Sequence, residues 1–129
     1  MEKRSSVFFV EGDKTLADIY VPRVEEVGWK VVRTISFSET QRRLKRSVPQ
    51  VFIVDVEDDE ESEALAFFSH LRSIASLSAI PVIVLTHAPS PSFIQTMHEQ
   101  GMHACFLKAY TRPATLLKIL SQLGFENKN

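Results

Sequence analysis

The stretch VFIVD at Val51–Asp55 places four consecutive apolar residues directly before a carboxylate. A second run, IPVIVL at Ile80–Leu85, is also continuous and rich in Val and Ile, and Thr86 follows it. Runs of this composition are typical of strands that are buried on both faces of a parallel sheet. The two stretches therefore predict two interior strands, each with a polar residue at its carboxyl end.

Amphipathic stretches alternate with five apolar runs along the chain, and the other three runs are Val7–Val10, Trp29–Ile35 and Ala104–Leu107. Alternation of strands and helices at this spacing predicts a parallel sheet with helices on both of its faces. Right-handed crossovers leave few topologies for five strands, and the order 2-1-3-4-5 is favoured at this size. We therefore expect a doubly wound α/β fold, the flavodoxin-like three-layer sandwich.

Helical periodicity places the expected helices between and after these strands. Three of them are expected at about Lys14–Val27, Ser38–Ser47 and Pro91–Gln100. Two more are indicated by apolar residues that recur at three and four positions, one before the fourth strand and one at the end of the chain. The last helix is expected to begin after Thr111, a candidate N-cap, and to end near Gly124.

Composition limits the functions that the chain can have. Its 129 residues suit a single domain over residues 1–129, and 15 basic against 16 acidic side chains leave a net charge of -1. This balance gives no general reason to expect direct binding to nucleic acid or to a membrane. The single cysteine, Cys105, excludes an internal disulfide and a Cys-based zinc site, so we expect a cytoplasmic protein.

Polar residues follow four of the five apolar runs. Glu11-Gly12-Asp13 follows the first run, Asp55 the third, Thr86 the fourth and Lys108 the fifth. Ligands of parallel α/β sheets bind outside the carboxyl ends of the strands, so these side chains are expected to converge on one crevice. A carboxylate can act as a nucleophile, and an ammonium group can balance the charge of a phosphoryl group. The set therefore indicates phosphoryl chemistry at this edge of the sheet.

Over essentially its whole length the sequence resembles a response-regulator receiver domain of two-component signalling. The stretches that carry the resemblance are VFFVEGD, VFIVD, IPVIVLT and GMHACFLK, at Val7–Asp13, Val51–Asp55, Ile80–Thr86 and Gly101–Lys108. It implies that Asp55 accepts a phosphoryl group from a histidine kinase or a histidine phosphotransfer protein. A domain of this kind is a phosphoacceptor with at most slow self-dephosphorylation, and not otherwise an enzyme.

The resemblance also assigns roles around the phosphoacceptor. It implies that Thr86 bonds the phosphoryl oxygens and that Lys108 pairs with them. It implies a Mg²⁺ ion held by Asp55, by Glu11 and by the backbone carbonyl of Glu57.

Asp13 is a further candidate for the metal, because it follows Glu11 by two residues. The resemblance implies that a downstream protein binds the face of the fourth helix, fifth strand and fifth helix, about residues 91–124, with a homodimer as a further candidate assembly.

Three positions depart from the receiver pattern. Gly12 stands where the resemblance puts a second acid, Ala109 replaces the proline that usually follows the lysine, and Cys105 replaces the switch aromatic. Phe106 or Tyr110 could take the place of that aromatic residue. These departures leave open a pseudo-receiver, in which the same fold is a protein-binding module that works without phosphorylation.

Two charged segments have a plain and a functional interpretation. Seven of the nine residues from Asp55 to Glu63 are acidic, which either attracts Mg²⁺ and raises the pKa of Asp55 or stabilises the start of the next helix. The basic run of Arg42, Arg43, Lys45 and Arg46 is either a solvated helix face or a docking patch for an acidic partner. For Cys105 we expect a small apolar residue packed inside the domain rather than a redox sensor.

Overall fold

Five parallel strands form the centre of the molecule in the order β2-β1-β3-β4-β5, as the alternation of apolar runs and amphipathic stretches predicts. The computed structural model describes residues 6–108 and 111–123. The strands are β1 (Ser6–Val10), β2 (Lys30–Thr34), β3 (Val51–Val56), β4 (Val82–Thr86) and β5 (Ala104–Leu107). The helices are α1 (Lys14–Glu26), α2 (Phe37–Arg43), α3 (Glu61–Ser73), α4 (Pro91–Glu99) and α5 (Pro113–Gln122), with a short 3-10 turn η1 (Asp58–Glu60) before α3.

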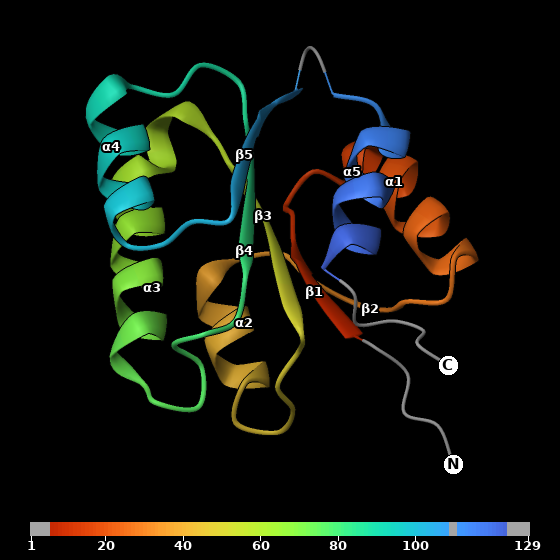
Figure 1. Cartoon of the computed structure of the whole chain (residues 1–129), viewed down its shortest axis with the longest axis horizontal. Helices are drawn as coiled ribbons and strands as arrows, with labels where there is room; N and C mark the ends of the chain where they lie inside the picture. The colour runs from red at the N-terminus through yellow and green to blue at the C-terminus, as the bar shows by residue number, and fades with distance from the viewer. Residues whose placement is uncertain (1–5, 109–110, 124–129) are drawn as a thin grey trace.

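Two layers of helices cover the sheet, with α1 and α5 on one face and α2, α3 and α4 on the other (Figure 1). Successive strand residues point to opposite faces, so each interior strand contributes to two hydrophobic clusters. In β3, Phe52 and Val54 pack in the cluster that includes α3 and α4, whereas Val51 and Ile53 pack in the cluster that includes α1 and α5. Burial on both faces explains why this strand has no polar residue before Asp55.

Several predicted boundaries differ from the structure by a few residues. β3 extends to Val56, so Asp55 lies inside the strand rather than after it. α2 begins at Phe37 and ends at Arg43, because the Ser36 hydroxyl caps its first turn and Leu44 is its C-cap. The N-cap of α5 is Arg112, one residue after the predicted Thr111. The predictions that concern Ala109, Tyr110 and Gly124 lie outside the described residues.

Candidate functional site

The register of the central strands brings two acids together at the carboxyl edge of the sheet. Val10 of β1 pairs with Val54 of β3, so Glu11 and Asp55 are the next residues on adjacent strands. Ile53 points toward the α1 and α5 layer, and the alternation of β3 therefore directs Asp55 to the same face. Both acids are buried, with relative exposures of 1% for Glu11 and 5% for Asp55. Two neighbouring buried carboxylates require a cation, a shared proton or both.

Lys108 supplies a positive charge to this pair from the end of β5. Its Nζ lies 2.6 Å from Oδ1 of Asp55 and 3.0 Å from Oε2 of Glu57. Its side chain is 17% exposed and that of Asp55 is 3% exposed, so this ion pair is largely shielded from water. The structure therefore brings together Asp55 and Lys108, which the sequence places on two different strands.

Two carboxylate oxygens inside the cluster have no hydrogen-bond donor. They are Oε1 of Glu11 and Oδ1 of Asp55. Oδ1 of Asp55 lies 2.6 Å from Lys108 Nζ, so the ammonium group compensates its charge. The other oxygen of Glu11, Oε2, accepts the backbone N–H of Asp13 at 3.1 Å. Buried polar atoms without a donor are rare and mark a place that a ligand can satisfy.

Burial and mutual repulsion shift the titration of these groups. Burial, followed by the nearby Asp55, raises the pKa of Glu11 to about 8. Burial also raises the pKa of Asp55 to about 6, although the Lys108 ammonium opposes this. The pKa of Glu57 is lowered, first by its interaction with the Asp55 carboxyl group and second by the Lys108 ammonium group. Burial lowers the pKa of Lys108, but Asp55 and Glu57 outweigh it and raise that pKa above its ordinary value. Perturbed carboxylates of this kind are characteristic of functional sites.

Thr86 lies at the end of β4 but does not point toward Asp55. Its hydroxyl is buried and donates a 2.9 Å hydrogen bond to the backbone carbonyl of Val56. The register explains this, because Thr86 pairs with Val56 and not with Asp55. The alternation of β4 continues from Val84, which faces the α3 and α4 layer, so Thr86 is directed to the face opposite Asp55.

Asp13 and the backbone carbonyl of Glu57 are engaged in local structure. The Asp13 side chain caps α1 by accepting the backbone N–H groups of Thr15 at 2.9 Å and Leu16 at 3.4 Å. The Glu57 carbonyl accepts the backbone N–H of Glu60 at 2.9 Å, which closes the turn before α3. A carbonyl oxygen has a second lone pair, so its assignment as a metal ligand stays a prediction.

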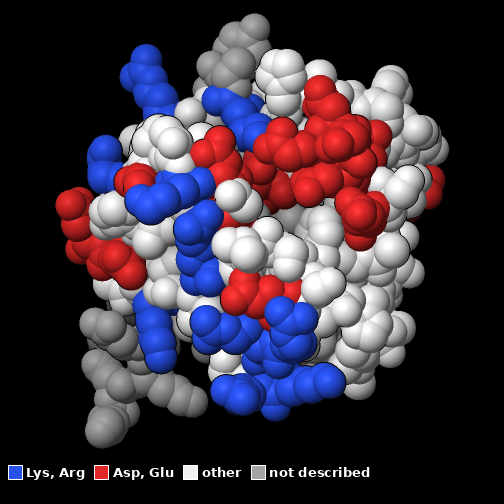
Figure 2. Space-filling view, turned by 180° about the vertical axis from the view of Figure 1, so that it is seen from behind, with Lys and Arg blue, Asp and Glu red and all other residues white. Residues whose placement is uncertain are grey.

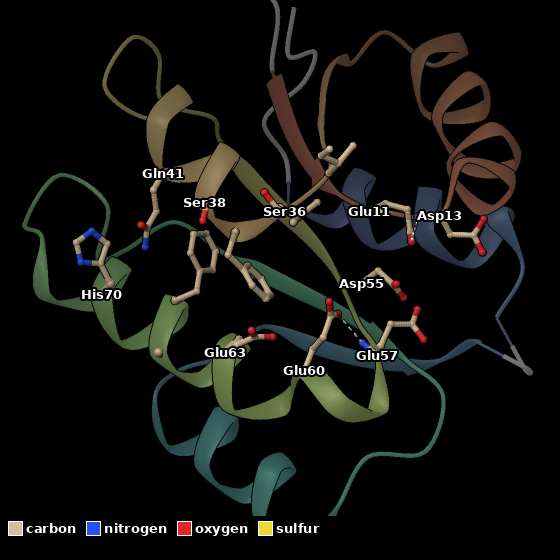
Figure 3. A pocket seen from close by; sticks show the side chains of 16 residues that line it. Glu11, Asp13, Ser36, Ser38, Gln41, Asp55, Glu57, Glu60, Glu63 and His70 are labelled. Atoms are coloured by element: carbon tan, nitrogen blue, oxygen red, sulfur yellow. Dashed lines mark hydrogen bonds between the residues drawn. The ribbon is translucent and has the colours of Figure 1, made fainter.

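A cavity of about 670 Å³ opens beside the acidic cluster and continues between α2 and α3. In Figure 3, Asp55 lies between Glu11 and Glu57 at one end, and the side chains of Gln41 and His70 line the other end. Figure 2 shows a large patch of acidic side chains in the upper part of this side of the molecule and a basic patch at the foot, where α2 lies. A cavity of this volume lies in the range of small-molecule binding sites.

The exposure of the basic run is compatible with both of its interpretations, and most of the acidic tract lies outside the buried cluster. Arg42, Arg43, Lys45 and Arg46 are all exposed. In the acidic tract, Glu61 accepts hydrogen bonds from the backbone N–H and the hydroxyl of Ser90 at 2.9 and 2.8 Å. Of the acids between Val56 and Glu63, Glu57 alone joins the buried acids.

Cys105 is half-buried against the α3 and α4 core, and burial raises the pKa of its thiol.

Sequence reasoning missed two contributors to the site. The side-chain carboxylate of Glu57 joins the cluster, whereas only its backbone was predicted to take part. Arg33 of β2 donates from Nε and Nη2 to the backbone carbonyl of Glu11, at 3.1 and 2.8 Å, and so holds the end of β1. The acid at position 57, two residues after Asp55, was a signal for the contribution of the Glu57 side chain. The contact of Arg33 with the Glu11 carbonyl depends on strand pairing and had no signal in the sequence.

The acidic cluster fits a divalent cation that prefers oxygen ligands. Within residues 6–108 and 111–123, carboxylate oxygens of Glu11, Asp55 and Glu57 lie within 4.8 Å of one another. Two of these residues also carry the buried oxygens that lack a hydrogen-bond donor. Mg²⁺ is typically held by one or two carboxylates together with water and phosphate oxygens. The donor set is therefore sufficient for such an ion.

Several solved structures that are similar to this chain are receiver domains or response regulators. The chain is similar to the signal receiver domain of a signal transduction histidine kinase from Syntrophus aciditrophicus, with 23% identity, a TM-score of 0.75, and coverage of 97% of this chain and 96% of that one. It is similar to the chemotaxis response regulator CheY4 of Vibrio cholerae, with 20% identity, a TM-score of 0.79 and coverage of 94% and 99%. A third is the phosphorylated cyanobacterial phytochrome response regulator RcpA, with 18% identity, a TM-score of 0.72 and coverage of 94% and 91%. The fold is thus the one that the sequence resemblance implied.

No protein-family model and no curated protein sequence matches the chain. The likeness to the solved structures therefore lies in the fold. Among the described helices, none has both the length and the hydropathy needed to cross a bilayer.

Proposed function

We propose that this chain is the receiver domain of a two-component phosphorelay, in which Asp55 accepts a phosphoryl group with the help of Mg²⁺ and a protein-binding face responds. The observation that carries the proposal is the contact between Lys108 Nζ and Asp55 Oδ1 at 2.6 Å, inside a cluster of buried acids. Lys108 follows β5 and Asp55 lies in β3, so the fold brings together two residues that are far apart in the sequence. Their pairing places a fixed positive charge beside the proposed nucleophile.

The transfer itself asks little covalent chemistry of the protein. A carboxylate oxygen of Asp55 attacks the phosphorus of the donor and forms the O–P bond of an acyl phosphate. The bond from phosphorus to the donor nitrogen or oxygen breaks, and the donor atom leaves with the bonding electron pair. A histidine nitrogen that leaves in this way takes up a proton, whereas acetate released from acetyl phosphate needs none. Catalysis then rests on positioning and on neutralising the phosphoryl charge.

The residues of the site divide this work among them. Lys108 is placed to pair with the phosphoryl oxygens, as it now pairs with Asp55. Glu11, Asp55 and Glu57 would hold Mg²⁺, which when bound neutralises negative charge on the phosphoryl group. The hydroxyl of Thr86 would have to leave the carbonyl of Val56 to reach a phosphoryl oxygen. That exchange of hydrogen-bond partner is a local change through which phosphorylation could move the end of β4.

The proposed partners are a histidine kinase or histidine phosphotransfer protein as donor, and a downstream protein as receiver of the signal. The face formed by α4, β5 and α5 presents two large exposed apolar side chains, Ile94 at 39% and Leu107 at 40%. Exposed apolar residues of this kind are suited to a protein interface. The cytoplasmic location, the homodimer and the absence of direct nucleic-acid or membrane binding stay predictions.

Labelling by a small phosphodonor tests the proposal. Wild-type protein incubated with acetyl phosphate and Mg²⁺ is expected to gain one phosphoryl group by intact-mass spectrometry. The adduct should be absent without Mg²⁺ and absent in Asp55→Ala. Glu63→Gln serves as the matched control, because Glu63 lines the same cavity but lies outside the carboxylate cluster. No adduct in the wild type at saturating donor and Mg²⁺ would overturn the proposal.

The second candidate function is a pseudo-receiver, a protein-binding module that works without phosphorylation. Two observations favour it: Gly12 supplies no second acid after β1, and the Thr86 hydroxyl is committed to the Val56 carbonyl. This candidate predicts that Asp55→Asn leaves partner binding unchanged and that Mg²⁺ does not bind the cluster. Calorimetry that detects Mg²⁺ binding at millimolar or lower concentration would count against it.

A further inference from the structure

We propose that the side-chain carboxylate of Glu57 is the second acidic metal ligand of this site and replaces the one that Gly12 does not provide. This inference rests on the proposed function, because it concerns the Mg²⁺ ion that the phosphoacceptor site would use. The resemblance assigned Glu57 only a backbone role, so the assignment of its side chain is new.

The loop after β1 supplies fewer acids than the receiver pattern implies. Glu11 is buried beside Asp55, but the next residue is a glycine, and Asp13 turns its side chain to the first turn of α1. The loop after β1 therefore contributes one carboxylate to the cluster. A site with Glu11 and Asp55 alone would have lost an acid from its metal shell.

Glu57 fills this gap from the other side of the site. Its carboxylate lies within 4.8 Å of those of Glu11 and Asp55, although its side chain is 50% exposed and has room to turn away into water. Three carboxylates are thus gathered without any contribution from position 12. In Figure 3 the three side chains converge on the same end of the cavity.

Two features hold Glu57 in this position. Lys108 Nζ lies 3.0 Å from Glu57 Oε2 and 2.6 Å from Asp55 Oδ1, so one ammonium group bridges the two acids. The backbone N–H of Glu57 donates to Oε1 of Glu60 at 3.0 Å, which fixes the turn that presents the side chain. Without a bridging cation, repulsion would favour the solvated rotamers of Glu57.

An independent reason to expect a ligand comes from the buried end of the cluster. Oε1 of Glu11 has no hydrogen-bond donor, and Glu11 is 1% exposed. An acidic cluster on a surface is common without an ion, but a buried and unpaired oxygen within it is not. A cation bound between Glu11, Asp55 and Glu57 would satisfy this oxygen.

The test uses a rescue at position 12. The backbone permits Gly12→Asp, because Gly12 does not have a positive φ and an added Cβ would lie 3.4 Å from the Ile35 carbonyl oxygen, at the edge of ordinary contact. Mg²⁺ affinity is measured by isothermal titration calorimetry for wild type, Glu57→Gln, Gly12→Asp and the double variant. Glu57→Gln keeps the size of the side chain and a hydrogen-bond acceptor for Lys108. Urea unfolding of each variant verifies that it is folded.

We expect Glu57→Gln to weaken Mg²⁺ binding by about tenfold to a hundredfold, as losses near a metal commonly do. The double variant should recover most of this loss, because the acid then returns from β1. Glu63→Gln, which makes the same charge change outside the cluster, should alter the affinity by less than about threefold, because salt and water screen an exposed charge. Equal affinities for Glu57→Gln and Glu63→Gln would overturn the inference, and so would a folded double variant without recovery.

The outcome separates this inference from the proposed function. If acetyl phosphate labels the wild type with Mg²⁺ but Glu57→Gln does not change the Mg²⁺ affinity, the proposed function holds and the inference on Glu57 is wrong. Protein whose Mg²⁺ affinity depends on Glu57 but which forms no adduct keeps the inference and rejects the function. A wild type that does not bind Mg²⁺ rejects both.

Discussion

Two groups of acids lie within a few residues of each other in this protein, and their surroundings make them chemically different. Glu11 and Asp55 are buried at the edge of the sheet. Asp58 and Asp59 of η1 and Glu63 in the first turn of α3 are exposed. Burial raises the pKa of both buried acids. The exposed acids lie at the start of α3, where negative charge is favourable.

The number of acids in a segment therefore does not show which of them join the buried site. The tract from Asp55 to Glu63 contains seven acidic residues, but the cluster takes only Asp55 and Glu57 from it. Its third member, Glu11, comes from another strand. A charged group has an unusual pKa where water is excluded, because its electrostatic interactions with neighbouring groups are screened less there.

The largest expected effect comes from removing the lysine of the buried ion pair. Lys108→Met leaves Asp55 without its cation, and we expect it to lower the free energy of unfolding by about 3 kcal/mol at pH 8. Lys14→Met removes an exposed ion pair with Asp18, in which the two side chains are 80% and 63% exposed, and should cost at most about 0.5 kcal/mol. Urea unfolding without Mg²⁺ measures both. Equal losses in the two variants would show that the Lys108 pair is no more shielded than a surface pair.

A smaller effect concerns the pH dependence of stability. The pKa of Glu11 is about 8 in the folded protein and 4.5 in the unfolded chain, so between these values the folded state binds more protons. The free energy of unfolding of the metal-free protein should therefore fall as pH rises from about 5 to 8, by about 1.4 kcal/mol per pH unit at most. Glu11→Gln removes this titration and should flatten the slope above pH 6.

Urea unfolding at pH values from about 6.5 to 8 with EDTA present measures this slope. Below pH 6 the raised pKa of Asp55 contributes in the same direction, so the two proteins are compared above that value. A slope that is identical in wild type and Glu11→Gln would mean that Glu11 titrates like an exposed carboxyl group. Burial would then not raise the pKa of Glu11 as we expect.

The smallest effect is expected within the exposed tract. Glu60 accepts the backbone N–H of Glu57 through its side chain, and Glu60→Ala should lower the free energy of unfolding by about 0.5 to 1 kcal/mol, as the loss of a helix cap does. Asp59→Ala removes an exposed acid from the same turn and should stay within about 0.5 kcal/mol of wild type. Thermal unfolding at low salt compares them. A larger loss for Asp59→Ala would reverse the assignment of the cap.

Much of the site could be predicted from the pattern of apolar runs. Asp55 and Lys108 were assigned to the ends of the third and fifth strands, and in parallel sheets those ends share one edge. That topology predicts that the two residues lie near each other, and the structure shows their side chains in contact at 2.6 Å. Glu11 was predicted in the same way, from the end of the first strand.

The orientations of individual side chains could not be predicted. Thr86 is at the expected strand end, but the register with Val56 turns its hydroxyl away from Asp55. Asp13 was a candidate metal ligand, and in the structure one oxygen of its side chain caps α1, so its metal role stays a prediction. The role of the Glu57 side chain depends on where Lys108 reaches, which a sequence does not state.

The sequence by itself determined the order of the strands, the edge at which the site lies and the residue types gathered there. These follow from hydrophobic periodicity and from the handedness of crossovers, which are local or general properties of chains. The tertiary structure decided which acids are buried, which oxygens lack a donor and which cation they share. Those depend on strand register and on contacts between residues far apart in the chain, because burial and charge act through space and not along the sequence.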